Sequence, residues 1–180
     1  MKKGVLKICV LILVLSFFGI TNFYAQSQGM VSIVIDPKMA VEGPYKTSEH
    51  GELDITLRVA CHHLKYEIGA FTELFPAIEY YGFGLFFKYK FLLEKNPKKF
   101  NRWVLPIGAD VGFIKRNQEF EEKVLMFNFA IDGGVRFFMT KNIGLELGIN
   151  YRYRSDLEEI YQDNFQMRYN VYSGLVFVWE

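Results

Sequence analysis

The strongest constraint on this chain is a strict alternation of apolar and polar residues from position 143 to position 154. The odd positions carry Ile, Leu or Tyr, and the even positions carry Gly, Glu, Asn or Arg. Successive side chains of a β-strand point to opposite faces, so the segment predicts a strand with one apolar face and one polar face. Apolar residues spaced two apart favour a closed sheet over a bundle of helices.

Seven further segments show the same period of two. Together with the first, they predict strands at 30–36, 52–61, 64–73, 80–91, 102–114, 124–138, 143–154 and 165–179. Most of them reach the ~10 residues with which a strand tilted by about 45° crosses the apolar layer of an outer membrane. Single-chain bacterial barrels have an even number of strands. The sequence therefore predicts an all-β fold, an eight-stranded antiparallel up-and-down transmembrane β-barrel.

The first 25 residues have the layout of a secretory signal peptide. Three lysines form a basic start, residues 8–20 are mostly apolar, and Ala25 is a small residue at the expected cleavage site. The apolar run is shorter than the ~20 residues of a transmembrane helix, which argues against the alternative of an uncleaved membrane anchor. We expect cleavage to leave one mature domain at 26–180.

The charge of the mature segment argues against a nucleic-acid partner. Residues 1–25 hold three of the 21 basic residues and none of the 20 acidic ones, which leaves 18 bases against 20 acids and a formal charge of −2. Nucleic-acid binding requires a basic surplus. Cys61 is the one cysteine of the mature segment, so an internal disulfide is not expected.

Alternation alone leaves open which face of the barrel is apolar, because a soluble lipocalin-like barrel would turn its apolar face inward. Roughly forty apolar side chains would not fit in the lumen of an eight-stranded barrel, which its own side chains fill. Glycines also gather on the polar face, where they make room in a narrow interior but would weaken a solvent-facing strand. Both observations predict an apolar exterior. The glycines are Gly69, Gly82, Gly84, Gly108, Gly112, Gly134, Gly144, Gly148 and Gly174.

An apolar exterior places the polar face, with nearly equal numbers of acids and bases, inside the barrel. Buried charges have to be paired and hydrogen-bonded, because an unpaired one costs several kcal/mol. We therefore expect a mutually neutralising ion network in the lumen, with an ion or solute pathway as the alternative. The predicted acids are Glu52, Asp54, Glu67, Glu73, Asp110, Asp132 and Glu146, and the predicted bases are Arg58, Lys65, Lys88, Lys90, Arg136, Arg152, Arg154 and Arg168.

With its signal, its strand count and an aromatic final strand at 172–179, the chain resembles the small eight-stranded outer-membrane proteins of the OmpA-transmembrane and OmpX type. The resemblance covers 26–180. It implies an outer-membrane location with lipid as the surrounding partner, both termini in the periplasm, short periplasmic turns and longer outer loops. The implied outer loops are 37–51, 72–79, 115–123 and 155–164, and the implied turns are 61–64, 92–101 and 139–142.

The implied topology also places aromatic residues near both rims of the barrel. Aromatic girdles lie at the two membrane interfaces of such barrels. The outer rim would carry Tyr81, Phe113, Tyr151, Tyr153 and Tyr169, and the inner rim would carry Phe91, Trp103, Phe137 and Trp179.

Two sequence features suggest chemistry beyond architecture. Cys61, His62 and His63 are metal-ligand types, but adjacent histidines on an extended chain point apart, so we expect an ordinary turn without a metal or cofactor. A lipid A-modifying hydrolase or acyltransferase would need a serine activated by a histidine. Ser173 is expected on the membrane side and His50 in an outer loop, and the sequence has no His-x-Ser motif. We interpret Ser173 as a packing residue.

The sequence therefore predicts a non-enzymatic membrane barrel that has a structural role or interacts through its loops. The loops at 115–123 and 155–164 are rich in Glu and Asp, which we interpret as a solvated charged surface. An extracellular protein or glycan is the partner that such loops would contact, and we expect a monomer. The alternatives are a narrow pore, a lipid A-modifying enzyme and a soluble lipocalin-like ligand carrier.

Overall fold

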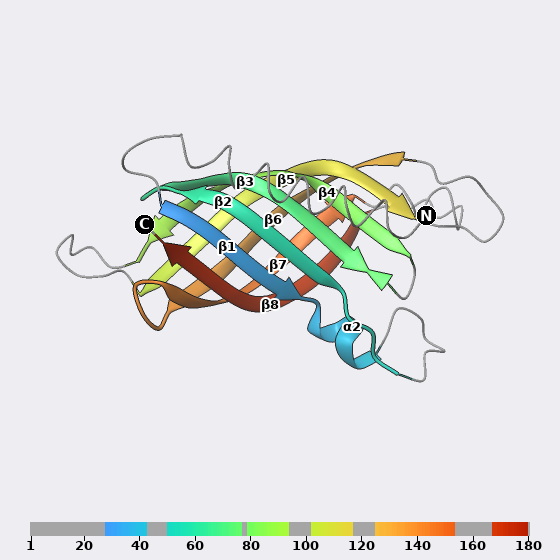
Figure 1. The fold of residues 1–180 in the computed structure, drawn as a ribbon, viewed down its shortest axis with the longest axis horizontal. Coiled ribbons are helices and arrows are strands. Elements are labelled where there is room, and N and C mark those ends of the chain that lie inside the picture. The colour runs from blue at the N-terminus through green and yellow to red at the C-terminus, as the bar shows by residue number, and fades with distance from the viewer. Residues whose placement is uncertain are drawn as a thin grey trace.

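The computed structural model describes residues 28–42, 50–76, 79–93, 102–116, 125–153 and 167–179. They form a closed barrel in which each strand pairs antiparallel with its neighbours in the chain, and the first strand closes on the last (Figure 1). The eight-stranded up-and-down barrel predicted from the alternation is confirmed. The strands are β1 (Gln28–Ile35), β2 (Ile55–His62), β3 (Tyr66–Phe75), β4 (Tyr80–Leu92), β5 (Trp103–Arg116), β6 (Leu125–Phe138), β7 (Ile143–Tyr153) and β8 (Met167–Trp179).

The two ends of the barrel differ in their connections (Figure 1). We call the end where β1 begins and β8 ends the termini end; it also holds the turns from β2 to β3 and from β6 to β7. We call the opposite end the loop end; there β1 leads into the short helix α2 (Pro37–Glu42). The β1–β8 register runs from Gly29 opposite Trp179 to Ile35 opposite Ser173, so the described sheet has no free edge.

The first connection contains a short helix where the sequence predicts a loop over 37–51. The Asp36 carboxylate caps this helix, because its Oδ1 atom accepts the backbone N–H groups of Lys38 at 2.8 Å and Met39 at 3.2 Å. Pro37 stands at the first helical position, where a missing N–H costs nothing. Burial raises the pKa of the Asp36 carboxyl, and the two amide hydrogen bonds oppose that rise.

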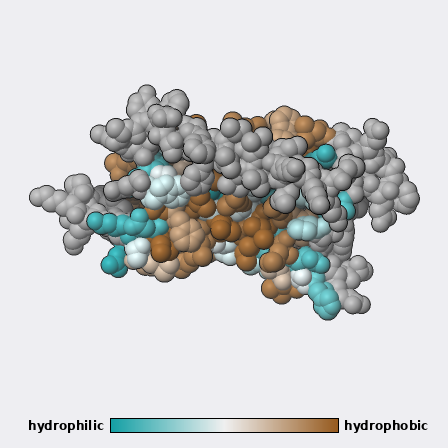
Figure 2. Space-filling view, in the orientation of Figure 1, coloured by the Kyte–Doolittle hydropathy of each residue, from teal (hydrophilic) through white to brown (hydrophobic). Residues whose placement is uncertain are grey.

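The outer surface of the barrel carries the apolar side chains of alternate residues. Along β7, Ile143, Leu145, Leu147 and Ile149 are 36–55% exposed, whereas the residues between them are buried. Hydrophobic residues cover much of the middle of the visible face, and hydrophilic residues lie toward its ends (Figure 2). The described part of the chain holds no helix with the length and apolar character needed to cross a membrane.

Aromatic side chains contact one another at both ends of the outer surface. At the termini end the Trp103 ring lies 4.7 Å from that of Phe137, and at the loop end the Tyr151 ring lies 4.6 Å from that of Tyr169. The predicted rim residues thus lie at opposite ends of their strands. Those at the loop end are Tyr81, Tyr151 and Tyr153, and those at the termini end are Phe91, Trp103 and Trp179.

Two apolar clusters lie inside the barrel, where the sequence predicts a network of ions. Their members stand at the same inward positions as the charged residues, so the prediction is incomplete: apolar side chains fill the lumen beside the ions. The cluster toward the termini end consists of Met30, Ala60, Phe71, Phe86, Val104, Phe138, Val176 and Val178. The cluster at the loop end consists of Phe75, Tyr80, Ile114 and Met126, and Met39 of α2 packs against it.

Gly148 shows why a glycine faces this lumen. It lies opposite Tyr172 in the β7–β8 register. A Cβ atom at position 148 would overlap the phenol ring of Tyr172, which is buried. Because Gly148 leaves this space free, the Tyr172 hydroxyl can donate to the Asp132 carboxylate at 3.2 Å.

We predict that Gly148→Ala lowers the free energy of unfolding by about 1–3 kcal/mol, because it overpacks the interior against Tyr172. Gly133→Ala on β6 is the matched control, since a Cβ atom there would meet Ile107 Cγ1 at an ordinary 3.8 Å. Urea unfolding in detergent micelles, followed by tryptophan fluorescence, measures both. Equal stability of the two variants would contradict this packing role.

Candidate functional site

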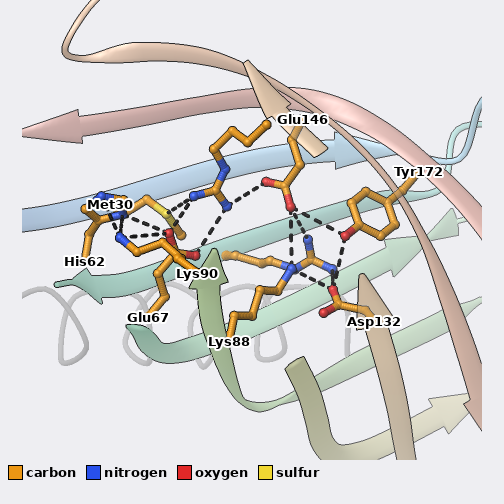
Figure 3. Close-up of polar contacts among 10 residues, drawn as sticks. Met30, His62, Glu67, Lys88, Lys90, Asp132, Glu146 and Tyr172 are labelled. Atoms are coloured by element: carbon orange, nitrogen blue, oxygen red, sulfur yellow. Dashed lines mark hydrogen bonds and ion pairs between the residues drawn. The ribbon is translucent and has the colours of Figure 1, made fainter. Parts of the chain in front are cut away.

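The charged side chains of β2 to β7 meet in the lumen of the barrel, and most of them lie in a connected network (Figure 3). They stand at alternate strand positions, which all face inward. Glu67, Arg136 and Glu146 are at most 2% exposed. Charges that are so far removed from water depend on one another for stabilisation.

Arg136 on β6 is the centre of the first group of contacts. Its Nη1 atom lies 2.5 Å from Glu67 Oε1, and its Nη2 atom lies 3.3 Å from Glu67 Oε2. Nη2 also donates to Glu146 Oε2 at 3.0 Å. Glu146 is the register partner of Arg136 on β7, whereas Glu67 reaches the guanidinium from β3. One arginine therefore connects strands on different sides of the lumen.

A second group surrounds Asp132 on β6. Its Oδ2 atom accepts from Lys88 Nζ at 2.6 Å, from Arg58 Nη2 at 3.3 Å and from the Tyr172 hydroxyl at 3.2 Å. The Arg58 guanidinium also lies over the Tyr172 ring, 4.8 Å from its centroid. Glu146 Oε1 lies 3.5 Å from Lys88 Nζ and 3.7 Å from Arg58 Nη1. Glu146 therefore joins this group to Arg136.

A further ion pair lies nearer the loop end. Arg152 Nη1 on β7 lies 2.6 Å from Glu73 Oε1 on β3, and the Tyr80 hydroxyl donates to Glu73 Oε2 at 3.4 Å. All three side chains are buried. The ring of Tyr80 belongs to the apolar cluster at that end, so this pair is covered by apolar side chains.

His62 lies in the lumen, whereas the sequence predicts it in a turn. The β-ladder between β2 and β3 continues to His62, which pairs with Glu67, and this extension turns the ring inward. Its Nδ1 atom lies 2.8 Å from Glu67 Oε1, and its Nε2 atom lies 2.8 Å from Lys90 Nζ. His63 instead stacks on Tyr66 at 4.5 Å between ring centroids. Among the described residues, no group of three metal-ligating side chains could hold an ion.

Two of the predicted lumen charges lie outside the lumen. Glu52 is exposed ahead of β2, which begins at Ile55 rather than at 52. Lys65 is exposed in the turn before β3, which begins at Tyr66. The prediction is wrong for both because the alternation extends past the ends of the paired strands.

Two further predicted charges are buried, and two fall outside the described side chains. Asp110 is buried on the inner face of β5, where its Oδ1 atom has no hydrogen-bond partner among the described residues. Asp54 is buried just ahead of β2. Arg154 falls outside the described residues, as does the side chain of Arg168.

Sequence reasoning missed the lumen roles of His62, Tyr80 and Tyr172. Each has the same parity as the inward charges of its strand, so the period of two would have found them. From the sequence, Tyr80 and Tyr172 receive no role in the lumen, and His62 is expected in a turn. The partners of these side chains could not be inferred, because Tyr172 and Asp132 are 40 residues apart.

The described residues offer no activated serine. Ser173 lies at an outward position of β8, opposite Ile35 on one side and Leu147 on the other. His50 is exposed ahead of β2. Within the described ranges the structure shows no contact between these two side chains.

The fold has counterparts among solved structures, although no family model and no curated protein matches the sequence. The N-terminal β-barrel domain of Pseudomonas aeruginosa OprF superposes with a TM-score of 0.56 at 11% identity, over 86% of this chain and 98% of that one. Neisserial surface protein A gives 0.46 at 14% identity, over 86% and 96% of the two chains. The chain thus has the fold of the small eight-stranded outer-membrane barrels that its sequence resembles.

We predict that Arg136→Met lowers the free energy of unfolding by about 3–5 kcal/mol, because it leaves Glu67 and Glu146 buried without their shared cation. Lys141→Met in the exposed β6–β7 turn is the control and should change it by less than about 0.5 kcal/mol. Adding Glu67→Gln to Arg136→Met should recover part of the loss. Urea unfolding in micelles would contradict the network if Arg136→Met behaved like the control.

Proposed function

We propose that this chain is a non-enzymatic integral barrel of the outer membrane whose lumen is closed, and that its role is structural or is carried out by its outer loops. The observation that carries the proposal is the division of the strands into an exposed apolar face and an inner face of buried, paired charges. A barrel with this division is suited to lipid outside and does not need water inside.

The outer surface supports insertion in a membrane over the alternative of a soluble ligand carrier. A lipocalin-like barrel would hold its large apolar side chains inside and expose polar ones. Here Leu85, Phe87, Ile131 and Leu147 are at least half exposed around the outside. Placed in water, such a surface would drive association, because apolar patches of this extent mark a buried environment.

The interior supports a closed lumen over the alternative of a narrow pore. A conducting barrel needs solvent beside its charged groups, but Lys88, Arg136 and Glu146 are at most 2% exposed. Apolar side chains also lie toward both ends of the charged network, including Phe138 at the termini end and Met126 at the loop end. An ion crossing the lumen would have to separate several buried ion pairs.

The topology of the barrel supports a role for the loops. Under the proposed orientation the termini end faces the periplasm and the loop end faces outward. The connections at the loop end then present the acidic segments 115–123 and 155–164 to an extracellular protein or glycan. Lipid would be the partner of the strands, and a monomer is sufficient because the sheet closes on itself.

Membrane fractionation and planar-bilayer recording test the proposal together. The protein should sediment with outer membranes, change its gel mobility on heating, and give no conductance steps at neutral pH. Recovery as a soluble monomer that carries a hydrophobic ligand would favour the lipocalin-like alternative. Stable conductance would favour the pore, and altered lipid A that depends on Ser173 and His50 would favour the enzyme.

We predict that Leu147→Arg on β7 destabilises the inserted barrel by about 2–4 kcal/mol, because it places a charge on the lipid-facing side near mid-strand. Leu53→Arg is the matched control, since Leu53 is 54% exposed and Leu147 is 55% exposed, but Leu53 lies ahead of β2. Urea titration in liposomes measures both variants. Equal effects would argue against lipid around β7.

A further inference from the structure

At the termini end of the lumen, His62 lies beside Glu67 and Lys90 (Figure 3). His62 is the last residue of β2, and its side chain is 14% exposed. Its ring lies between the Glu67 carboxylate of β3 and the Lys90 ammonium of β4. The edge of the ring contacts Phe138 of β6, with 6.4 Å between the ring centroids.

The partners of the ring determine which nitrogen carries the proton. Lys90 Nζ lies 2.8 Å from Nε2 and 3.2 Å from Nδ1. An ammonium group is a donor only, and the Glu67 carboxylate beside Nδ1 is an acceptor only, so Nε2 is the nitrogen that accepts from Lys90. The proton of a neutral ring then lies on Nδ1, which donates to Glu67 Oε1 at 2.8 Å. His62 therefore fits the site as the neutral Nδ1–H tautomer.

A second proton on the ring would turn the Lys90 contact into a repulsion. Nε2–H would face the ammonium group at hydrogen-bond distance, and the guanidinium of Arg136 from β6 acts on the ring as a further positive charge. Glu67 is the acid in contact with the ring, and it already holds Arg136 through both of its oxygens. From β1, the nearby contact is the uncharged sulfur of Met30 on Arg136, and Glu146 of β7 lies beyond that arginine.

We propose that His62 and Lys90 form an acid-operated latch at the termini end of the lumen. At neutral pH the ring holds Lys90 against Glu67. One proton on His62 releases Lys90, which then keeps one contact with an acid in the described lumen, Glu67 Oε1 at 3.7 Å. This release loosens the termini end of the barrel, while the Arg136–Glu67 pair remains.

The proposed latch predicts that the barrel loses stability in acid and that this loss depends on His62. The unfolded chain takes up a proton on His62 near pH 6.5, whereas the latched state does not. The unfolded state therefore binds more protons, and stability falls as the pH is lowered. The unfolding equilibrium constant of the wild type should rise about tenfold more than that of His62→Gln between pH 8 and pH 5.5. Glutamine can donate to Glu67 and accept from Lys90 without titrating.

The neighbouring histidine supplies a matched control for the measurement. His63 stacks on Tyr66 and makes no contact with Lys90 among the described residues. The wild type, His62→Gln and His63→Gln are purified in micelles from the membranes that express them and unfolded in urea from pH 8 to pH 5. His63→Gln should follow the wild type, and His62→Gln should lose the histidine-dependent step.

Lys90→Met tests the direction in which the contribution of His62 to stability changes with pH. A purely structural role of Lys90 would leave that direction unchanged. Without the ammonium group, a protonated His62 would gain from Glu67, so the contribution of His62 to stability should grow in acid instead of declining. The proposal is overturned if His62→Gln keeps the wild-type pH dependence or if Lys90→Met fails to reverse its sign. It is also overturned if ¹⁵N NMR of the wild type finds the Nε2–H tautomer at neutral pH.

Discussion

The pairing of buried charges in the lumen is the interaction on which the rest of this barrel depends. Arg136 lies between Glu67 and Glu146. Lys88 and Arg58 each contact both Glu146 and Asp132. Each of these groups would cost several kcal/mol if it were buried alone. They are stable inside because every charge reaches a partner from another strand, and this requirement fixes how the strands face one another.

The exterior and the interior of the barrel follow from the same alternation but meet different physical requirements. Outside, apolar side chains need no partners and are suited to lipid. Inside, the diameter of an eight-stranded barrel leaves room for its own side chains or one small ligand. Glycines such as Gly148 make room for large groups such as Tyr172, and apolar clusters lie toward both ends of the ions. The lumen is therefore filled by apolar packing as well as by paired charges.

The period of two was sufficient to predict the barrel, its apolar exterior and most of the inward charges. It could not predict partners, because Arg136 and Glu67 are 69 residues apart and meet only once strand tilt and closure are set. It failed at strand ends, where pairing stops before the alternation does, as Glu52 shows. Parity also places apolar residues such as Phe71 and the ring of His62 in the lumen, so the lumen is less polar than its charged residues alone indicate.

Fluorescence quenching of Trp103 tests the division between lipid and lumen most directly. Trp103 is 44% exposed at the outer surface of β5, and Trp179→Phe removes the second tryptophan from the signal. In liposomes, brominated lipids should quench Trp103 strongly and aqueous iodide should quench it weakly. Strong quenching by iodide with little effect of brominated lipids would place this face in water and contradict the account.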